Sequence, residues 1–179
     1  MRARWGFGKE KMEFEVPDDL CLGTVEGTAA EPLPPLPDLA QAVEQALEDP
    51  AGAPPLGELV RPGDTVAVAC PDFHRLWSQP RRWLPLLVRH LNRAGVRERD
   101  VTVVVANGTH APPTYAQLAQ ILGEGLPPGV RVVNHDARDP SLLRYLGRTP
   151  FGTPLWVTRH ALEADHLVLT GAVVSHAFA

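Results

Sequence analysis

Four short apolar runs, separated by segments with helix or turn signals, constrain the fold of this chain most. The first run, at residues 65–70, reads Thr-Val-Ala-Val-Ala-Cys, without alternation between polar and apolar positions. Such a run is typical of a strand covered on both faces, as in a parallel sheet. The other three runs are at residues 101–106, 130–133 and 166–174. Strands that alternate with helices predict an α/β fold, with a mostly parallel, Rossmann-like sheet and flanking helices.

The segments between the runs carry the helix signals. We expect one helix from about Ser78 to a stop at Gly95. Thr114 and Gln117 have capping-box spacing and open a second helix, which ends at Gly123. Weaker signals predict a helical turn at 141–146, an edge strand at 155–158 and a short helix that ends at 162–164.

The first part of the chain does not follow this alternation. Runs at 4–7 and 12–16 flank a Gly8-Lys9-Glu10 turn and predict a small β-hairpin, with a third strand at 20–25. The stretch 31–37 has proline at four of its seven positions, and proline lacks the N–H that helices and central strands need. We therefore divide the chain into a hairpin appendage (1–30), a proline-rich connector (31–37) and an α/β unit (38–179).

Charge, cysteine content and hydropathy argue against a nucleic-acid-binding, disulfide-stabilised, secreted or membrane-spanning protein. The net charge is −4, and phosphate binding relies on clustered basic residues, so we expect no nucleic-acid partner. Cys21 and Cys70 are too few and too far apart for a disulfide framework, which favours a reducing compartment. The start of the chain lacks the apolar stretch of a secretory signal, and no window is long and apolar enough to span a bilayer. We therefore expect a cytoplasmic location.

Polar side chains follow the apolar runs, where the carboxyl ends of parallel strands form a ligand-binding crevice. A single histidine there is most often a plain loop residue, but several strand ends together indicate a site. In an extended chain neighbours alternate sides, so we expect His74 to point away if its neighbours point inward. The residues concerned are Asp72, His74 and Arg75, then Asn107 to His110, then Asn134, His135 and Asp136, and finally Ser175 and His176. The trio around His135 also fits a simple Asx turn.

His110 and His176 are the strongest candidates for acid–base work. Gly108 lets the backbone approach a ligand, and Pro112-Pro113 fixes the loop after His110. An imidazole has a pKa near neutrality, so two of them across one carbon centre suit a racemase or epimerase. Arg75 is expected to clamp a substrate carboxylate with two hydrogen bonds.

A zinc site is the competing interpretation of the same histidines. The usual spacings, such as H-E-x-x-H or paired C-x-x-C, are absent, so we expect no metal ligands in this chain. A glycine-rich phosphate loop is also absent, because Gly108-Thr109-His110 lacks the further glycines.

Several of these segments resemble the lactate racemase family, the nickel-pincer-dependent 2-hydroxyacid isomerases. The resemblance implies that His110 and His176 take the substrate hydroxyl proton while a hydride moves from carbon to the nickel-pincer nucleotide. It also implies that Arg75 holds the substrate and that Asp72 supports the site. The segments that carry the resemblance are Phe7-Gly8-Lys9-Glu10-Lys11, Asn107-Gly108-Thr109-His110, Asn134-His135-Asp136, and Gly171 with Ser175-His176-Ala177-Phe178-Ala179.

The chain departs from the family pattern in two ways. The family segment Asp-x-Thr-Arg-Pro reads Asp72-Phe73-His74-Arg75-Leu76 here, so the resemblance implies a small 2-hydroxyacid rather than lactate in particular. The family's cofactor lysine, nickel-binding histidine and C-terminal domain are expected beyond Ala179. We therefore expect no covalently bound cofactor on this chain, and no activity of the chain alone.

Three hypotheses follow. The first is the N-terminal part of a racemase or epimerase, which needs a C-terminal domain. The second is a non-catalytic binding or assembly module of the same fold. The third is one subunit of a split enzyme whose partner chain carries the cofactor lysine. Apolar surface left without a covering domain would also favour a homo-oligomer.

Overall fold

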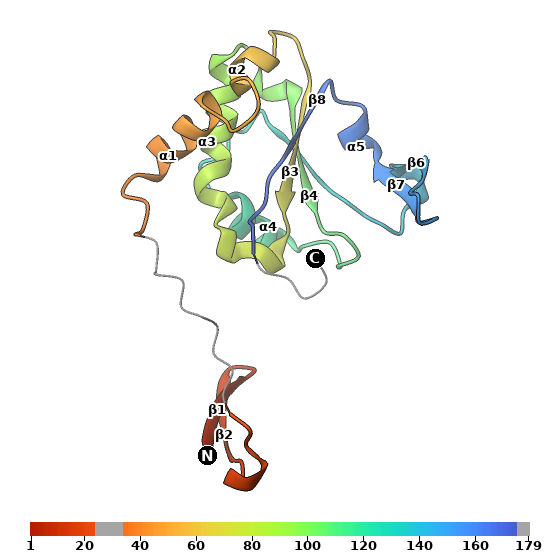
Figure 1. Cartoon of the computed structure of the whole chain (residues 1–179). Coiled ribbons are helices and arrows are strands. Elements are labelled where there is room, and N and C mark those ends of the chain that lie inside the picture. Colours follow the sequence, from red (N-terminus) through yellow and green to blue (C-terminus); the bar gives the residue numbers. More distant parts are fainter. Residues whose placement is uncertain (24–33, 175–179) are drawn as a thin grey trace. The chain divides into compact units, whose positions relative to one another are not determined.

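The structure is a computed structural model that describes residues 1–23 and 34–174 of the 179-residue chain. It divides into two compact units, Met1–Pro35 and Leu36–Ala179. Figure 1 shows the helices and strands of both units, which we describe separately. Among the described residues no helix combines the length and apolar character needed to cross a membrane.

The first unit is the expected β-hairpin. Strand β1 (Arg2–Phe7) pairs antiparallel with β2 (Glu10–Glu15) across a two-residue turn, in which Gly8 has φ 63°. The third strand predicted at 20–25 is wrong in its described part, because the 3-10 helix η1 (Asp18–Leu20) occupies its start. Pro17 explains this turn: it has no N–H to extend a ladder, and its carbonyl accepts from Leu20 N at 3.0 Å.

The second unit contains the predicted parallel sheet. Its strands are β3 (Val66–Pro71), β4 (Val101–Ala106), β5 (Arg131–Asn134) and β8 (His166–Leu169), all parallel, in the order β5-β4-β3-β8. The two inner strands, β3 and β4, are the most apolar and the most buried of the four. This arrangement confirms the mixed α/β fold with its preceding hairpin.

The core lies between one face of the sheet and the helices α1 (Leu39–Glu48), α3 (Pro80–Arg93) and α4 (Tyr115–Leu122). Leu84 and Leu91 of α3 are fully buried there against alternate residues of β3 and β4. Burying a leucine contributes about 1.5–3 kcal/mol, so α3 is fixed mainly by this apolar face. On the opposite side of the sheet, α5 (Arg159–Leu162) contacts β3 and β4 and buries Ala161 (Figure 1).

Local sequence signals set the helix ends. Asp38 caps α1 by accepting from the backbone N–H groups of Ala40 and Gln41. Thr114 and Gln117 form the predicted capping box at the start of α4. The first half of the unit also contains the short helices α2 (Leu56–Leu59), η2 (Phe73–Ser78) and η3 (Glu98–Asp100).

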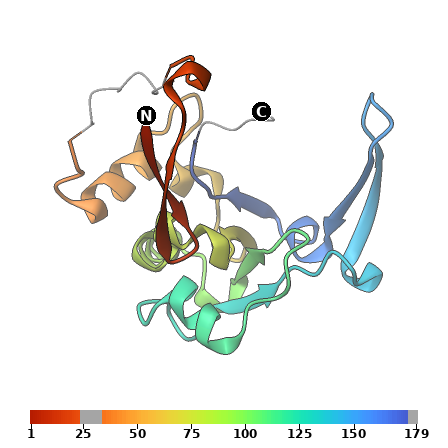
Figure 2. The same cartoon turned by 90° about the horizontal axis from the view of Figure 1, so that it is seen from below.

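Two sequence predictions in the last third of the chain are wrong. The helical turn predicted at 141–146 is confined to η4 (Pro140–Leu142), after which β6 (Leu143–Arg148) pairs antiparallel with β7 (Pro154–Thr158). These two strands form an arm that projects beyond α5 (Figures 1 and 2). The last strand was predicted over 166–174 but ends at Leu169. Its next ladder bond would need an N–H from Pro71, which proline does not have.

Candidate functional site

The carboxyl ends of β3 and β4 bring two predicted site residues together. These strands pair in register up to Pro71 and Ala106, so the residues that follow them begin side by side. Asp72 comes directly after β3, as the residue before the 3-10 helix η2. After β4 the chain makes a tight turn in which His110 N donates to Asn107 O at 2.9 Å. This turn directs His110 back towards Asp72.

Asp72 and His110 form a hydrogen-bonded pair. His110 Nδ1 lies 2.5 Å from Asp72 Oδ2. A carboxylate only accepts hydrogen bonds, so Nδ1 carries the proton and Nε2 is left as the free ring nitrogen. The Asp72 side chain is 7% exposed, whereas that of His110 is 47% exposed. The pair is therefore anchored in the protein at the carboxylate and open to solvent at the imidazole.

His74 joins this pair. Its ring lies 4.4 Å from the His110 ring, centroid to centroid, with 57° between the ring planes. His74 was expected to point away only if both Asp72 and Arg75 point inward; residues 73–78 form a 3-10 helix, so the alternation of an extended chain does not apply. A small hollow of about 120 Å³ lies beside these groups and is lined by Asp72, Phe73, His74, Asn107, Ala111, Pro112, Pro113 and Gln117.

Arg75 and His176 are not brought to this pair by the described structure. The Arg75 side chain is exposed, and it makes no hydrogen bond or ion pair with any residue in the described ranges. Its backbone carbonyl accepts from Ser78 Oγ at 2.7 Å, which stabilises the η2 turn that carries it. His176 lies outside the described residues, as does Ser175.

A buried amide, which the sequence analysis named only as part of a strand-end loop, fixes the loop after β4. Asn107 is 2% exposed, and its Nδ2 donates to His135 O at 3.0 Å. His135 N donates in turn to Val105 O at 3.0 Å, so the ends of β4 and β5 are tied together. Asp136 Oδ1 accepts from Arg138 N at 2.8 Å, which is the Asx turn that the sequence allowed. The position of Asn107, directly after a buried strand, was the available signal.

Two other histidines of the unit, His166 and His90, have structural partners. His166 Nε2 lies 2.8 Å from Asp64 Oδ2 at the amino ends of the strands, away from the Asp72 side of the sheet. This hydrogen bond lowers the pKa of the Asp64 carboxyl, with help from the backbone N–H of Arg61. His90 is buried on α3 and its Nδ1 lies 3.2 Å from Glu44 Oε1. These contacts hold elements together and do not converge on a ligand.

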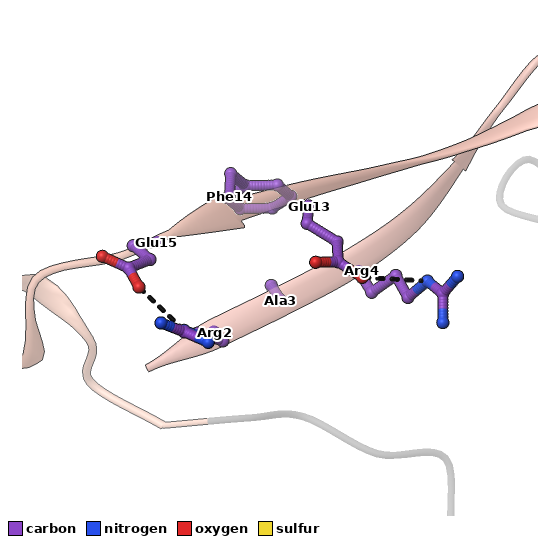
Figure 3. A pocket seen from close by; sticks show the side chains of 6 residues that line it. All are labelled: Arg2, Ala3, Arg4, Glu13, Phe14 and Glu15. Atoms are coloured by element: carbon purple, nitrogen blue, oxygen red, sulfur yellow. Dashed lines mark hydrogen bonds and ion pairs between the residues drawn. The ribbon is translucent and has the colours of Figure 1, made fainter.

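A larger hollow, of about 670 Å³, lies on the hairpin unit (Figure 3). It is lined by residues of β1 and β2, including two exposed ion pairs, Arg2 with Glu15 at 2.8 Å and Arg4 with Glu13 at 3.3 Å. Their charges are already neutralised by one another. We therefore place the candidate site at the strand ends of the second unit and not here.

Three residues with metal-ligating atoms lie close together at this site. A lysine, the residue expected to attach a cofactor, is absent from the second unit. One ligand atom each from Asp72, His74 and His110 can be chosen so that all lie within 4.8 Å of one another. The only lysines of the chain are Lys9 and Lys11, both in the hairpin unit. The strand ends of the second unit thus have groups for proton transfer and for metal binding, and residues 36–179 contain no lysine for attaching a cofactor.

Comparison with known proteins identifies the family. Residues 7–179 match the family of lactate racemase N-terminal domains. The lactate racemase of Thermoanaerobacterium thermosaccharolyticum is 28% identical over 173 residues, which are 97% of this chain and 40% of that protein. The lactate racemase of Lactiplantibacillus plantarum is 31% identical over 140 residues, covering 78% of this chain and 32% of the relative.

Solved structures agree with this match. The lactate racemase apoprotein from Thermoanaerobacterium thermosaccharolyticum superposes with a TM-score of 0.71 at 27% identity, covering 94% of this chain and 38% of that one. A Thermotoga maritima protein superposes with a TM-score of 0.55 at 20% identity, which shows a shared fold alone. The chain spans 40% or less of the length of the curated relatives. It belongs to the family of lactate racemase N-terminal domains.

Proposed function

We propose that this chain is the acid–base and substrate-binding part of a 2-hydroxyacid racemase or epimerase. Family membership supports the class of reaction. The single observation that carries the proposal is the 2.5 Å contact between His110 Nδ1 and Asp72 Oδ2 at the strand ends. Such a contact orients an imidazole and leaves its other nitrogen free for a proton, which is what general acid–base catalysis needs.

His110 would take the hydroxyl proton of the substrate. Its Nε2 would accept that proton when the substrate carbon is oxidised to the 2-ketoacid, a change that needs a hydride acceptor outside the described residues. The buried Asp72 carboxylate stabilises the imidazolium that forms, because the two groups are already hydrogen-bonded. A histidine on each side of the substrate would give the proton back to the oxygen, so one histidine would serve each enantiomer.

Arg75 and His176 have the two remaining roles in the proposed reaction, substrate binding and acid–base catalysis. The Arg75 guanidinium, exposed and without a described partner, would hold the substrate carboxylate through two parallel hydrogen bonds. His176 would serve as the second acid–base group, on the opposite face of the substrate. His74 stands where the family pattern has threonine, so we propose a small 2-hydroxyacid, and not lactate in particular, as substrate.

The hydride acceptor would be a nickel-pincer nucleotide in the complete enzyme. When bound, such a group accepts the hydride from carbon and returns it. The described residues do not fit its covalent attachment, because residues 36–179 contain no lysine. No step above therefore runs through it, and we propose that the chain alone is inactive and acts together with a further domain or a partner chain, in a reducing cytoplasm that keeps its two free cysteines reduced.

The experiment is a racemisation assay of the complete enzyme with a panel of enantiopure 2-hydroxyacids, read by chiral chromatography. His110→Ala and His176→Ala should each lower kcat about 100- to 10,000-fold, the usual contribution of a positioned acid–base group. His160→Ala is the matched control, since that histidine lies on α5 and makes no hydrogen bond or ion pair with the described residues. Normal turnover in His110→Ala would refute the assignment. Racemisation by the isolated chain with added cofactor would refute its inactivity.

A further inference from the structure

We propose that Asp72, His74 and His110 form a binding site for a divalent transition-metal ion of the zinc type, a property that goes beyond the proposed racemisation. Spacing along the sequence predicts no metal ligands, because the three residues come from two loops and match no ligand motif. The fold places them together after β3 and β4, with the two imidazole centroids 4.4 Å apart.

The separation of the donor atoms is close to what a zinc ion requires. Zinc binds imidazole nitrogen and carboxylate oxygen at about 2.0–2.2 Å, so two donors of one tetrahedral ion lie about 3.3 Å apart. The donors of Asp72, His74 and His110 lie within 4.8 Å of one another. Both histidine side chains are exposed, and His74 has no hydrogen-bond partner in the described parts of the chain. Rotation of the exposed His74 ring, with exchange of the Asp72–His110 hydrogen bond for a shared ion, would bring the three donors onto one ion.

The charge at the site favours a cation. Asp72 has a side chain that is 7% exposed, and among the described residues its carboxylate makes one hydrogen bond, to His110. A buried carboxylate needs compensation by donors or by a positive charge, and no lysine or arginine forms an ion pair with Asp72 in the described structure. A metal ion bound by Asp72 and the two neighbouring imidazoles would supply that charge.

The ligand set selects the class of ion. Two imidazoles and one carboxylate suit zinc and the neighbouring first-row metals, whereas calcium and magnesium prefer six or more oxygen ligands. Three protein ligands also leave a coordination position for water or a small anion. Because His110 would be one of the ligands, a bound ion would compete with proton transfer at that imidazole.

The test is a binding measurement on the untagged chain, freed of metal by dialysis against a chelator. Isothermal titration with ZnCl2 should give one site, and Co2+ should give the visible absorption of a low-coordinate complex. His74→Ala should weaken zinc binding at least 10-fold, and Asp72→Asn should do the same. His160→Ala should leave the affinity unchanged, as a control for the loss of any one histidine. Far-UV circular dichroism checks the fold of each variant, and His74 is exposed, so its replacement decides the test if Asp72→Asn unfolds.

Two results would overturn the metal site. One is the absence of saturable zinc binding at millimolar concentration, and the other is equal affinity in the wild-type chain and His74→Ala. The readout is binding alone, without substrate or cofactor. A failure here therefore leaves the racemisation assay unaffected, and a failure of that assay leaves the metal site unaffected.

Discussion

Replacing Gly95 by alanine tests how closely the end of α3 packs against Pro62, in the segment before β3. Gly95 has φ 95° and follows Ala94, the C-cap residue of α3; its N–H donates to Asn92 O at 3.0 Å and the Val96 N–H donates to Leu91 O at 3.1 Å. These two bonds are the Schellman motif, and Val96 and Leu91 are both buried beside it. A Cβ at position 95 would lie 2.6 Å from Cγ of Pro62, far inside van der Waals contact.

The cost of Gly95→Ala has two parts. An L-residue held at positive φ costs about 1–2 kcal/mol. Forcing an extra methyl group into a packed position costs about 1–3 kcal/mol more. Gly63→Ala separates the two parts, because Gly63 has nearly the same φ, 99°, and a Cβ there would meet nothing within 4 Å. We therefore expect a loss of about 2–5 kcal/mol at position 95 and about 1–2 kcal/mol at position 63.

Urea unfolding followed by circular dichroism at 222 nm gives both free energies of unfolding. The double variant Pro62→Ala with Gly95→Ala closes a mutant cycle that isolates the contact between the two residues. We expect Pro62→Ala to recover about 1–3 kcal/mol of the loss, the share assigned to overlap. Equal losses for Gly95→Ala and Gly63→Ala, or no coupling in the cycle, would refute the steric argument.

Two further outcomes follow from titratable groups. Burial raises the pKa of the Cys70 thiol to about 12. A thiol reagent at neutral pH should therefore label only Cys21 in the folded chain, and both thiols in urea. Rapid labelling of both thiols in the folded chain would contradict this. The hydrogen bond from His166 lowers the pKa of Asp64 in the folded state, so its stabilising contribution is present above the usual carboxyl pKa and is lost as the pH falls below about 4. Denaturation midpoints measured between pH 7 and pH 3 should therefore fall less steeply for Asp64→Asn than for the wild type, and identical slopes would contradict the assignment.

The sheet could be predicted because its signals are local. The run at 65–70 and the run that becomes β4 are apolar without alternation, and only a strand covered on both faces requires that pattern. The capping box at Thr114 likewise rests on residues three positions apart. Strand bounds that depend on a partner strand could not be predicted from local signals. Strand β6 forms because β7 pairs with it. Strand β8 ends because its next ladder hydrogen bond would need an N–H from Pro71 of β3.

The meeting of Asp72 and His110 at the strand ends was predictable, whereas the geometry of the candidate site was not. The rule that ligands bind beyond the carboxyl ends of parallel strands selected Asp72 and His110 correctly as neighbours. The orientation of His74 depends on whether residues 73–78 are extended or helical, and their sequence does not decide between the two. Asn107 was noted only as part of a loop, since its role as a buried tie to His135 depends on the position of β5.

Residue 74 decides which chemistry this strand end can support. Asp72 and His110 alone make an oriented acid–base pair, with one nitrogen free for a proton. A threonine at position 74, as in the family pattern, would add only a hydroxyl, which is a poor ligand for zinc. Histidine adds a second imidazole within reach of the same carboxylate, so the pair becomes part of a three-ligand set. Metal binding and proton transfer would then use the same atoms, so removing His74 should separate them.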